Sequence, residues 1–336
     1  MVELVYDMPC YKPLTGYRAR HVNKKTGKRP IVFSAADGYT DRLITLPCGK
    51  CFGCRLEYSR QWAIRCVHEA QLHEKNAFIT LTYNQENLPE DKSISKKELS
   101  NFYKRLRKNT GAIFKHYSCG EYGDKSGRAH YHGLIFGYDF PDKRLVKYTK
   151  SGDPLYRSEI LEKAWQNKGH VYIGSVTFES AAYVARYIMK KIKGNPDKNT
   201  HPEAYELNKK LKAERYNLVD ETTGELFNIE PEFCLQSRGG RKGKGIAYDW
   251  VKKYKSDTDK DFITIRGIKM KLPKYYDSIL EAKAKYDGLE DEFIERKYKR
   301  LKGAMKNAKD NTYDRLISKE IVKRAQINLL KRDLEE

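Results

Sequence analysis

Two histidines separated by one residue, His130 and His132, form the most chemically suggestive pair in the sequence. They stand in GRAHYHGLIFG at 127–137, where alternating apolar residues predict a β-strand. Residues two apart on a strand point to the same face, so both imidazoles lie side by side and Tyr131 faces the other way. Two imidazoles on one strand make half of a divalent-metal site. The alternative is a half-exposed histidine pair packed in a sheet, and the motif alone does not separate the two.

Three cysteines at metal-ligand spacing form a second candidate site. The segment PCGKCFGC places Cys48, Cys51 and Cys54 in a C-x-x-C-x-x-C pattern. Cys66 lies on the following predicted helix, ~18 Å along its axis from Cys54, which is too far for one tetrahedral zinc. We therefore read Cys66 as a buried thiol and prefer Cys10 as the fourth ligand. A structural zinc site is favoured over three free thiols.

A predicted helix at 180–193 carries a third set of reactive side chains. Tyr183 and Tyr187 are four residues apart, so their Cβ atoms lie ~6 Å from each other on one helix face. Lys190 shares that face. An amphipathic helix with two boundary tyrosines would look the same, so this helix decides nothing by itself.

Composition narrows the class of partner. The 336 residues are 33% charged, with a formal net charge of +21, a pI near 9.4 and 25 tyrosines. A chain this basic has a polyanion as its expected partner, and interleaved tyrosines can stack bases of a single strand. No apolar run approaches the ~20 residues of a membrane helix, and the first residues do not resemble a secretory signal. Together with the odd cysteine count, this predicts a cytoplasmic protein that does not enter a membrane.

The elements that must position these residues predict an α+β fold with a central antiparallel sheet and helices packed on it. Ser95 and Glu98 form a capping box for one helix, which runs to about Asn109. CGEYGDKSG has the composition of a hairpin turn before the histidine strand. The other predicted elements are a helix at 55–75 and strands at 77–83, 112–119 and 170–176.

Three domains are expected: a Cys-rich segment and helix at 1–75, a central domain at 76–195, and a basic, mainly helical region at 196–336. Residues 1–47 show few regular patterns. In the last region, 262–273 is strand-like and 278–334 reads as helix. SRGGRKGKG at 237–245 lacks the spacing of a phosphate-binding P-loop, and the sequence has no ATPase signature.

The order of three motifs, FITLTY, GRAHYHGLIFG and YVARYIMKK, resembles the HUH endonucleases and in particular rolling-circle replication initiators. Tyrosines that follow the histidines fit initiators and single-strand transposases better than conjugative relaxases. The closer similarity is to initiators of gokushovirus-type microviruses, which also look like PCGKCxxC followed by RQWAIRCVHEA, as at 47–70. The resemblance covers roughly residues 45–195.

This resemblance implies a Mg²⁺ or Mn²⁺ ion held by His130, His132 and one acidic residue. Glu121 is the candidate acid, with Asp124 as its substitute. The resemblance also implies that Tyr183 or Tyr187 attacks a phosphodiester to leave a 5′-phosphotyrosine and a free 3′-OH, while Lys190 orients the phosphate or stabilises its charge.

The function implied is nicking and rejoining of single-stranded origin DNA for rolling-circle replication of a small phage. The host replication machinery would be a partner and the host bacterial cytoplasm the location. A two-tyrosine HUH transposase is an alternative with the same chemistry. A non-enzymatic single-stranded DNA-binding or packaging protein is another, but it has no need of a histidine strand paired with a tyrosine helix.

Overall fold

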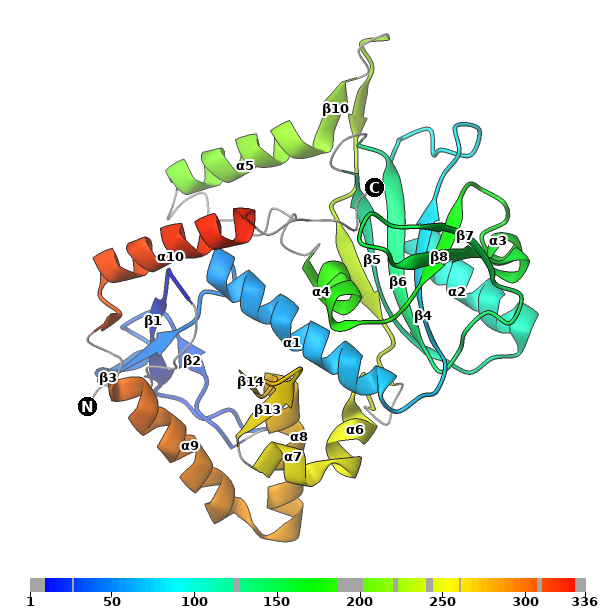
Figure 1. Ribbon diagram of the computed structural model, residues 1–336. Helices are drawn as coiled ribbons and strands as arrows, with labels where there is room; N and C mark the ends of the chain where they lie inside the picture. Colours follow the sequence, from blue (N-terminus) through cyan, green and yellow to red (C-terminus); the bar gives the residue numbers. More distant parts are fainter. Residues whose placement is uncertain are drawn as a thin grey trace. The chain divides into compact units, whose positions relative to one another are not determined.

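The largest element of the computed structural model is a seven-stranded sheet with the strand order β12-β5-β6-β4-β9-β8-β7 (Figure 1). Each pair of neighbouring strands runs antiparallel, as expected for the predicted α+β class. In chain order, its strands are β4 (Asn76–Thr82), β5 (Lys115–Tyr122), β6 (Ala129–Phe136), β7 (Arg144–Tyr148), β8 (Pro154–Arg157), β9 (Val171–Gly174) and β12 (Phe233–Gln236). The structure describes residues 10–25, 27–123, 127–186, 202–219, 223–239, 244–259, 261–306 and 310–329.

Helices cover both faces of this sheet at β5 and β6, which explains why nearly every residue of these two strands is buried. On the face of Tyr131, the core contains apolar side chains of α2 (Lys96–Thr110) and α3 (Glu159–Ala164). On the opposite face, Trp62 of α1 (Phe52–Ala70) stacks on Tyr117, with ring centroids 4.6 Å apart. A fourth helix, α4 (Phe178–Arg186), packs over β5 and β6.

The helix predicted from the Ser95 capping box is confirmed. Its N-cap, Ser95, accepts a hydrogen bond from the backbone N–H of Glu98 at 3.2 Å, and Gly111 closes the helix in the left-handed conformation with φ +66°. The Glu98 carboxylate pairs with Arg105 and Lys168, at 2.8 Å and 3.0 Å. The first turn of α2 is therefore tied to the segment that precedes β9.

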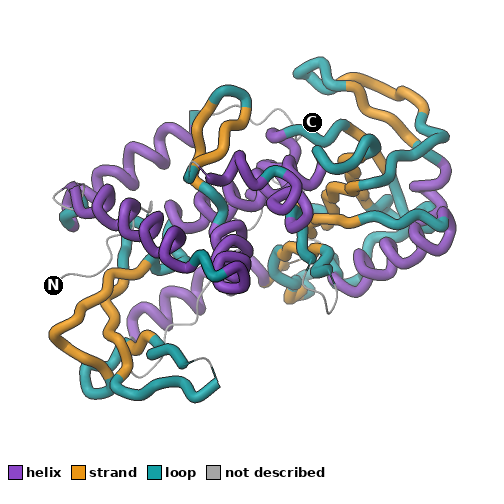
Figure 2. Tube along the Cα trace, turned by 90° about the horizontal axis from the view of Figure 1, so that it is seen from below, coloured by secondary structure: helices purple, strands orange, loops and turns teal. Residues whose placement is uncertain are grey.

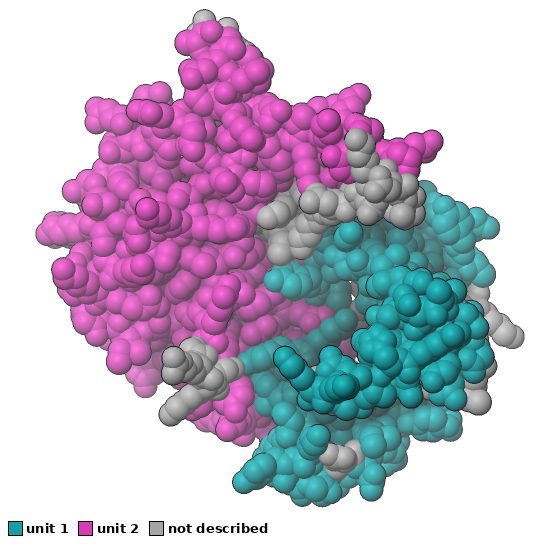
Figure 3. Space-filling model, turned by 180° about the vertical axis from the view of Figure 1, so that it is seen from behind, with its two compact units in different colours: residues 1–58, 274–331 teal, residues 59–273, 332–336 magenta. Residues whose placement is uncertain are grey.

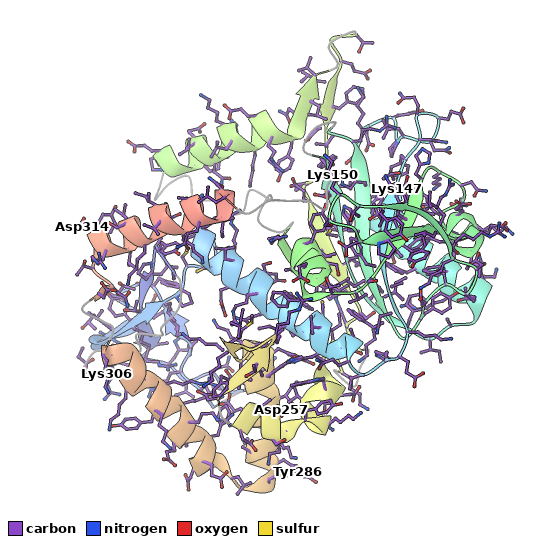
Figure 4. The ribbon with its side chains drawn as sticks, viewed as in Figure 1. Lys147, Lys150, Asp257, Tyr286, Lys306 and Asp314 are labelled. Carbon is purple, nitrogen blue, oxygen red and sulfur yellow. The ribbon has the colours of Figure 1, made fainter. Side chains whose placement is uncertain are left out.

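The edge strand β7 is exposed at all five positions. An open strand edge invites pairing with another chain, and lysines on it discourage that pairing. The ammonium of Lys147 lies 5.0 Å from the ring centroid of Tyr172, and Figure 4 labels Lys147 together with Lys150 in the following turn. The region around Trp165, which showed no clear pattern in the sequence, thus contains β7, β8 and α3.

Residues 1–58 and 274–331 form one compact unit, and residues 59–273 with 332–336 form the other (Figure 3). We call them unit 1 and unit 2. The predicted boundaries near 75 and 195 stay predictions about folding units. Within the described residues, no helix combines the length and apolarity needed to cross a membrane.

Unit 1 contains a three-stranded antiparallel sheet, in the order β2-β1-β3, in the segment where the sequence showed few patterns (Figure 2, strands near the N mark). Helices from the far end of the chain complete this unit. The guanidinium of Arg300 makes two 2.8 Å hydrogen bonds to Asp277, and Arg324 lies 4.4 Å from the ring centroid of Phe52. The elements are β1 (Leu14–Ala19), β2 (Ile31–Val32), β3 (Gly38–Leu46), α8 (Lys274–Asp287), α9 (Glu290–Lys306) and α10 (Tyr313–Asn328).

The rest of unit 2 is built from short elements. The predicted strand-like segment 262–273 is a hairpin whose two turn residues, Arg266 and Gly267, have φ +50° and +77°, as a tight two-residue turn requires. These elements are α5 (Pro202–Tyr216), β10 (Asn217–Val219), β11 (Leu226–Asn228), α6 (Tyr248–Lys253), α7 (Lys255–Asp259), β13 (Phe262–Ile265) and β14 (Ile268–Lys271).

Candidate active site

The register of the central sheet brings Glu121 and the two histidines together. Glu121 of β5 lies directly opposite His130 of β6, and Cys119 lies opposite His132. Directly opposed residues of an antiparallel pair project to the same face, so the carboxylate and both imidazoles share one side of the sheet. On the other flank of β6, Thr80 of β4 lies opposite His132.

The ligand atoms of this group converge on one carboxylate oxygen. His130 Nε2 lies 2.9 Å from Glu121 Oε1, and His132 Nε2 lies 3.0 Å from the same atom. One nitrogen of each histidine and one carboxylate oxygen all lie within 4.8 Å of one another. Two imidazole nitrogens and one carboxylate oxygen are a donor set suited to divalent transition metals and to Mg²⁺.

The outer nitrogens of both rings are held by further bonds. His130 Nδ1 lies 2.9 Å from the carbonyl oxygen of Arg128, and His132 Nδ1 lies 3.0 Å from Thr80 Oγ1. A carbonyl oxygen only accepts, so Nδ1 of His130 carries the proton, and a neutral His130 directs the Nε2 lone pair toward Glu121. Two acceptors 2.9 Å apart need a proton or a cation between them. The group therefore fits a metal ion on its own chemistry, with outer bonds of the kind that orient metal-binding histidines.

Burial sets the electrostatics of the carboxylate. Glu121 is 1% exposed, and burial alone would raise its pKa. The hydrogen bonds from His130 and His132 outweigh that effect and lower the pKa of Glu121 to about 2. The site thus holds a negative charge in a region that would otherwise exclude one, which favours a cation.

The tyrosine helix lies on the same face of the sheet as the histidines. Helix α4 begins with a reciprocal pair of hydrogen bonds: Thr177 N–H donates to Ser180 Oγ at 2.8 Å, and Ser180 N–H donates to Thr177 Oγ1 at 3.1 Å. The ring of Tyr183 meets the ring of His132 edge-on, with centroids 5.1 Å apart and an interplanar angle of 85°. Tyr183 also packs against Phe78 and is 6% exposed. The structure therefore brings Tyr183 beside the histidine group.

Three predicted site residues lie outside the described residues: Tyr187, Lys190 and the alternative acid Asp124. Sequence reasoning missed Thr80, which supports His132. The signal was present, because alternation along FITLT places Thr80 on the face opposite to Ile79 and Leu81, whose side chains are in the core.

Comparison with known proteins places this site in a family. A family model of replication-associated proteins of the ORF2 type matches residues 76–192, which begin at β4 and include the histidines, Glu121 and Tyr183. The chain is 31% identical over 250 residues to "Replication-associated protein ORF2" of Spiroplasma virus 4, covering 70% of this chain and 68% of that protein. This chain belongs to the phage replication-associated proteins.

Two further family members match over shorter stretches. The chain is 36% identical over 210 residues to "Replication-associated protein VP4" of Bdellovibrio phage phiMH2K, covering 58% of this chain and 62% of that protein. It is 35% identical over 154 residues to "Replication-associated protein ORF4" of Chlamydia phage 1, covering 44% and 38%. These two matches span less than two thirds of the relatives' own length. No solved structure matches the chain.

The cysteine cluster of this replication-associated protein lies in unit 1, outside the region that the family model matches. Cys10 and Cys51 have their sulfurs 3.9 Å apart, and Cys48 and Cys54 have theirs 4.0 Å apart. All four sulfurs lie within 4.8 Å of one another. Four sulfurs bound to one zinc at ~2.3 Å in a tetrahedron would be about 3.8 Å apart, so the cluster has the size of a zinc site.

Backbone amides surround these sulfurs. Cys48 Sγ accepts from the N–H groups of Lys50 and Cys51, at 3.4 Å and 3.2 Å, in a turn that Gly49 permits with φ +70°. Cys10 Sγ accepts from Cys48 N–H at 3.3 Å. Amide donors stabilise negative charge on sulfur, which is the form that binds a metal. By contrast, Cys66 is fully buried on α1 and burial raises its pKa, as expected for an inert thiol.

Proposed function

We propose that this chain is a replication initiator with an HUH endonuclease domain, which nicks and rejoins single-stranded origin DNA to start and end rolling-circle replication of a small phage genome. One observation carries the proposal: His130, His132 and Glu121 converge on one face of the sheet, and Tyr183 lies on the helix that packs over that face. A carboxylate–histidine group next to a tyrosine is the minimum that metal-assisted phosphodiester transfer to tyrosine requires.

His130, His132 and Glu121 would hold the divalent ion, Mg²⁺ or Mn²⁺. When bound there, such an ion would neutralise charge on the scissile phosphate and polarise it for attack. The protein supplies the orientation: the Arg128 carbonyl and the Thr80 hydroxyl fix the two imidazole rings from behind. Glu121 contributes a charge that stays ionised throughout the neutral pH range.

Tyr183 would act as a nucleophile. A phenol with an ordinary pKa of ~10 attacks poorly until nearby positive charge favours loss of its proton. The phenolic oxygen forms a bond to phosphorus, the bond from phosphorus to the 3′-oxygen breaks, and that oxygen leaves as a 3′-OH after taking up a proton. One phosphoester replaces another, so the 3′-OH can later reverse the step without ATP.

Tyr187 and Lys190 complete the proposal from their spacing in the sequence. A second tyrosine one turn after Tyr183 would cut a newly made origin while the first still carries the old end. Lys190 would orient the phosphate or stabilise its developing charge. The expected partners are the single-stranded origin and the host replication machinery, in the host bacterial cytoplasm.

The test is a covalent adduct. Purified protein with Mn²⁺ and an oligonucleotide tiled from its own genome's origin should form an SDS-stable species, and mass spectrometry should locate the linkage on Tyr183 or Tyr187. Tyr183→Phe with Tyr187→Phe should abolish the adduct, and each single variant should keep part of it. An adduct on any other residue would refute the assignment. A protein that binds every strand tightly and forms no adduct would favour the packaging alternative.

We also propose that Cys10, Cys48, Cys51 and Cys54 bind one structural Zn²⁺. The size of the sulfur cluster and its backbone amide donors support this assignment. Four thiolates suit zinc better than the hard cations expected at the histidine group. Such an ion would join the segment at Cys10 to the first turn of α1, and so hold the beginning of unit 1 in place.

A further inference from the structure

Unit 1 carries an open pocket of about 820 Å³, on the β2-β1-β3 sheet, which the nicking proposal does not use. A bulge between β1 and β3 accounts for it. Tyr17 pairs with Leu43, but Ala19 pairs with Gly38, so four residues of β3 (39–42) face the single residue Arg18. The extra backbone must leave the plane of the sheet, and bulges commonly re-aim side chains in this way. We call the result the bulge pocket; it is lined by Arg18, Lys28, Arg29, Tyr39, Asp41 and Arg42.

The charge of this lining is strongly positive. Four of the six lining residues are Lys or Arg, and Asp41 is the one carboxylate among them. Asp41 contacts Arg42 at 3.7 Å, in a pair whose side chains are 73% and 67% exposed and which solvent therefore weakens. Arg29 donates to the carbonyl oxygens of Ala19 and Arg20, which hold its guanidinium in place without neutralising it.

An aromatic ring stands among these cations. Tyr39 is 37% exposed, and the guanidinium of Arg29 lies 5.3 Å from its ring centroid. Between residues 10 and 46 the chain has eight Lys and Arg against two Asp and no Glu, a denser positive charge than in the chain as a whole. Phe33, just beyond β2, is 62% exposed. Fixed cations with an accessible ring are the features that bind single strands, whose bases are free to stack.

We propose that the bulge pocket binds single-stranded DNA, with phosphates on Arg18 and Arg42 and a base on Tyr39. This deepens the proposed function and rests on it for the nature of the ligand, since it gives the initiator a DNA contact in a different unit from the nicking site. A duplex is the weaker candidate because its bases are already stacked and cannot reach Tyr39.

Equilibrium binding without Mg²⁺ or Mn²⁺ tests the charges. Fluorescence anisotropy of a labelled single strand of about 20 nucleotides should show about tenfold weaker binding for Arg18→Gln with Arg42→Gln. The slope of log affinity against log salt should fall by about 1.4, which corresponds to two lost phosphate contacts on a single strand. The matched control is Lys104→Gln with Lys108→Gln, which removes two exposed charges from α2 of unit 2. Equal losses in both double variants would overturn the proposal.

The ring is tested separately. Tyr39→Ala should weaken single-strand binding by about fivefold or more, and Tyr39→Phe should bind like the wild type because the aromatic face remains. Thermal melts of each variant would show that unit 1 stays folded, and Arg42→Gln alone, at a highly exposed position, gives a minimal change. Weaker binding to duplex with unchanged binding to the single strand would refute the single-strand assignment.

Adduct formation separates this proposal from the nicking proposal. His130→Ala should lose the adduct and keep its anisotropy affinity, whereas the Arg18 and Arg42 double variant should lose affinity in the absence of metal. If no adduct forms with any protein, the binding difference still decides the bulge pocket. If adducts form and the pocket variants bind normally, the bulge pocket proposal alone fails.

Discussion

The histidine group and the cysteine cluster are both clusters of metal-ligand side chains, but the chain assembles them in different ways. Glu121, His130 and His132 sit on two neighbouring strands whose ladder fixes their register. Cys10 and Cys48 are separated by 38 positions of sequence that include a bulged, three-stranded sheet with little buried surface. The first group is positioned by the fold, whereas the second must help to position it. Metal removal should therefore affect activity at one site and folding at the other.

The largest effect is expected from the cysteines. Cys48→Ser should lose zinc and destabilise unit 1, because zinc binding by a structural cysteine site is worth on the order of 10 kcal/mol. Elemental analysis should find one zinc per wild-type chain, and limited proteolysis of the variant should cut unit 1 before unit 2. Cys66→Ala is the control: it removes a buried thiol outside the cluster and should retain the metal. A wild-type protein that is stable without zinc would contradict the comparison.

The histidine group should show the opposite behaviour. His130→Ala should reduce adduct formation at least ~100-fold, because removal of a ligand costs no less than the roughly 10–100-fold typical of its outer partners. Its thermal stability should change little, since His130 lies at the partly exposed end of the group. The exposed His170 provides a control, His170→Ala, that should keep full activity. A large loss of stability in His130→Ala would mean that this group also holds the fold together.

A smaller effect is expected from the hydroxyl behind His132. Thr80→Val keeps the shape of the side chain and removes the 3.0 Å contact with His132 Nδ1. The Mn²⁺ concentration for half-maximal adduct should rise about tenfold, as for other outer partners of metal ligands. Thr82→Val is the matched control, because its hydroxyl donates to the backbone carbonyl of His170 instead. If both variants need the same Mn²⁺ concentration, Thr80 does not position His132.

The contrast between the two groups also explains what the sequence could predict. The strand with His130 and His132, and the helix capped by Ser95, depend on local alternation and local capping, so both followed from the residues alone. Glu121 could be nominated because a hairpin turn joins its strand to that of the histidines. The identity of the helix over this face followed from Tyr183 only once the resemblance was considered.

Other features depend on contacts that no local pattern carries. Strand β12 joins the edge of the large sheet beside β5 from a distant part of the chain, and its four residues have no distinguishing alternation. The sheet of β1 to β3 escaped prediction because the bulge opposite Arg18 shifts the register and breaks the two-residue period. Its side chains are also largely exposed, so apolar patterning was weak there.

The smallest expected effect concerns histidines that bind no metal and serve the fold of unit 2. Burial lowers the pKa of His68 to about 3, and its ring stacks on Trp250 with centroids 3.5 Å apart. The unfolded chain takes up a proton near pH 6.5 that the folded chain refuses, so stability is complete above pH 6.5 and falls as the pH drops toward 3. At about pH 6 this histidine alone should cost about 1 kcal/mol.

Chemical denaturation at several pH values checks this prediction. His68→Phe keeps a ring on Trp250 and cannot titrate, so its unfolding free energy should decline less steeply between about pH 7 and 5 than that of the wild type. The difference between the two slopes isolates His68 from the cysteine cluster, whose thiolates also take up protons in acid. Parallel slopes would show that His68 is protonated in the folded state, and acid sensitivity would then belong to the cysteines alone.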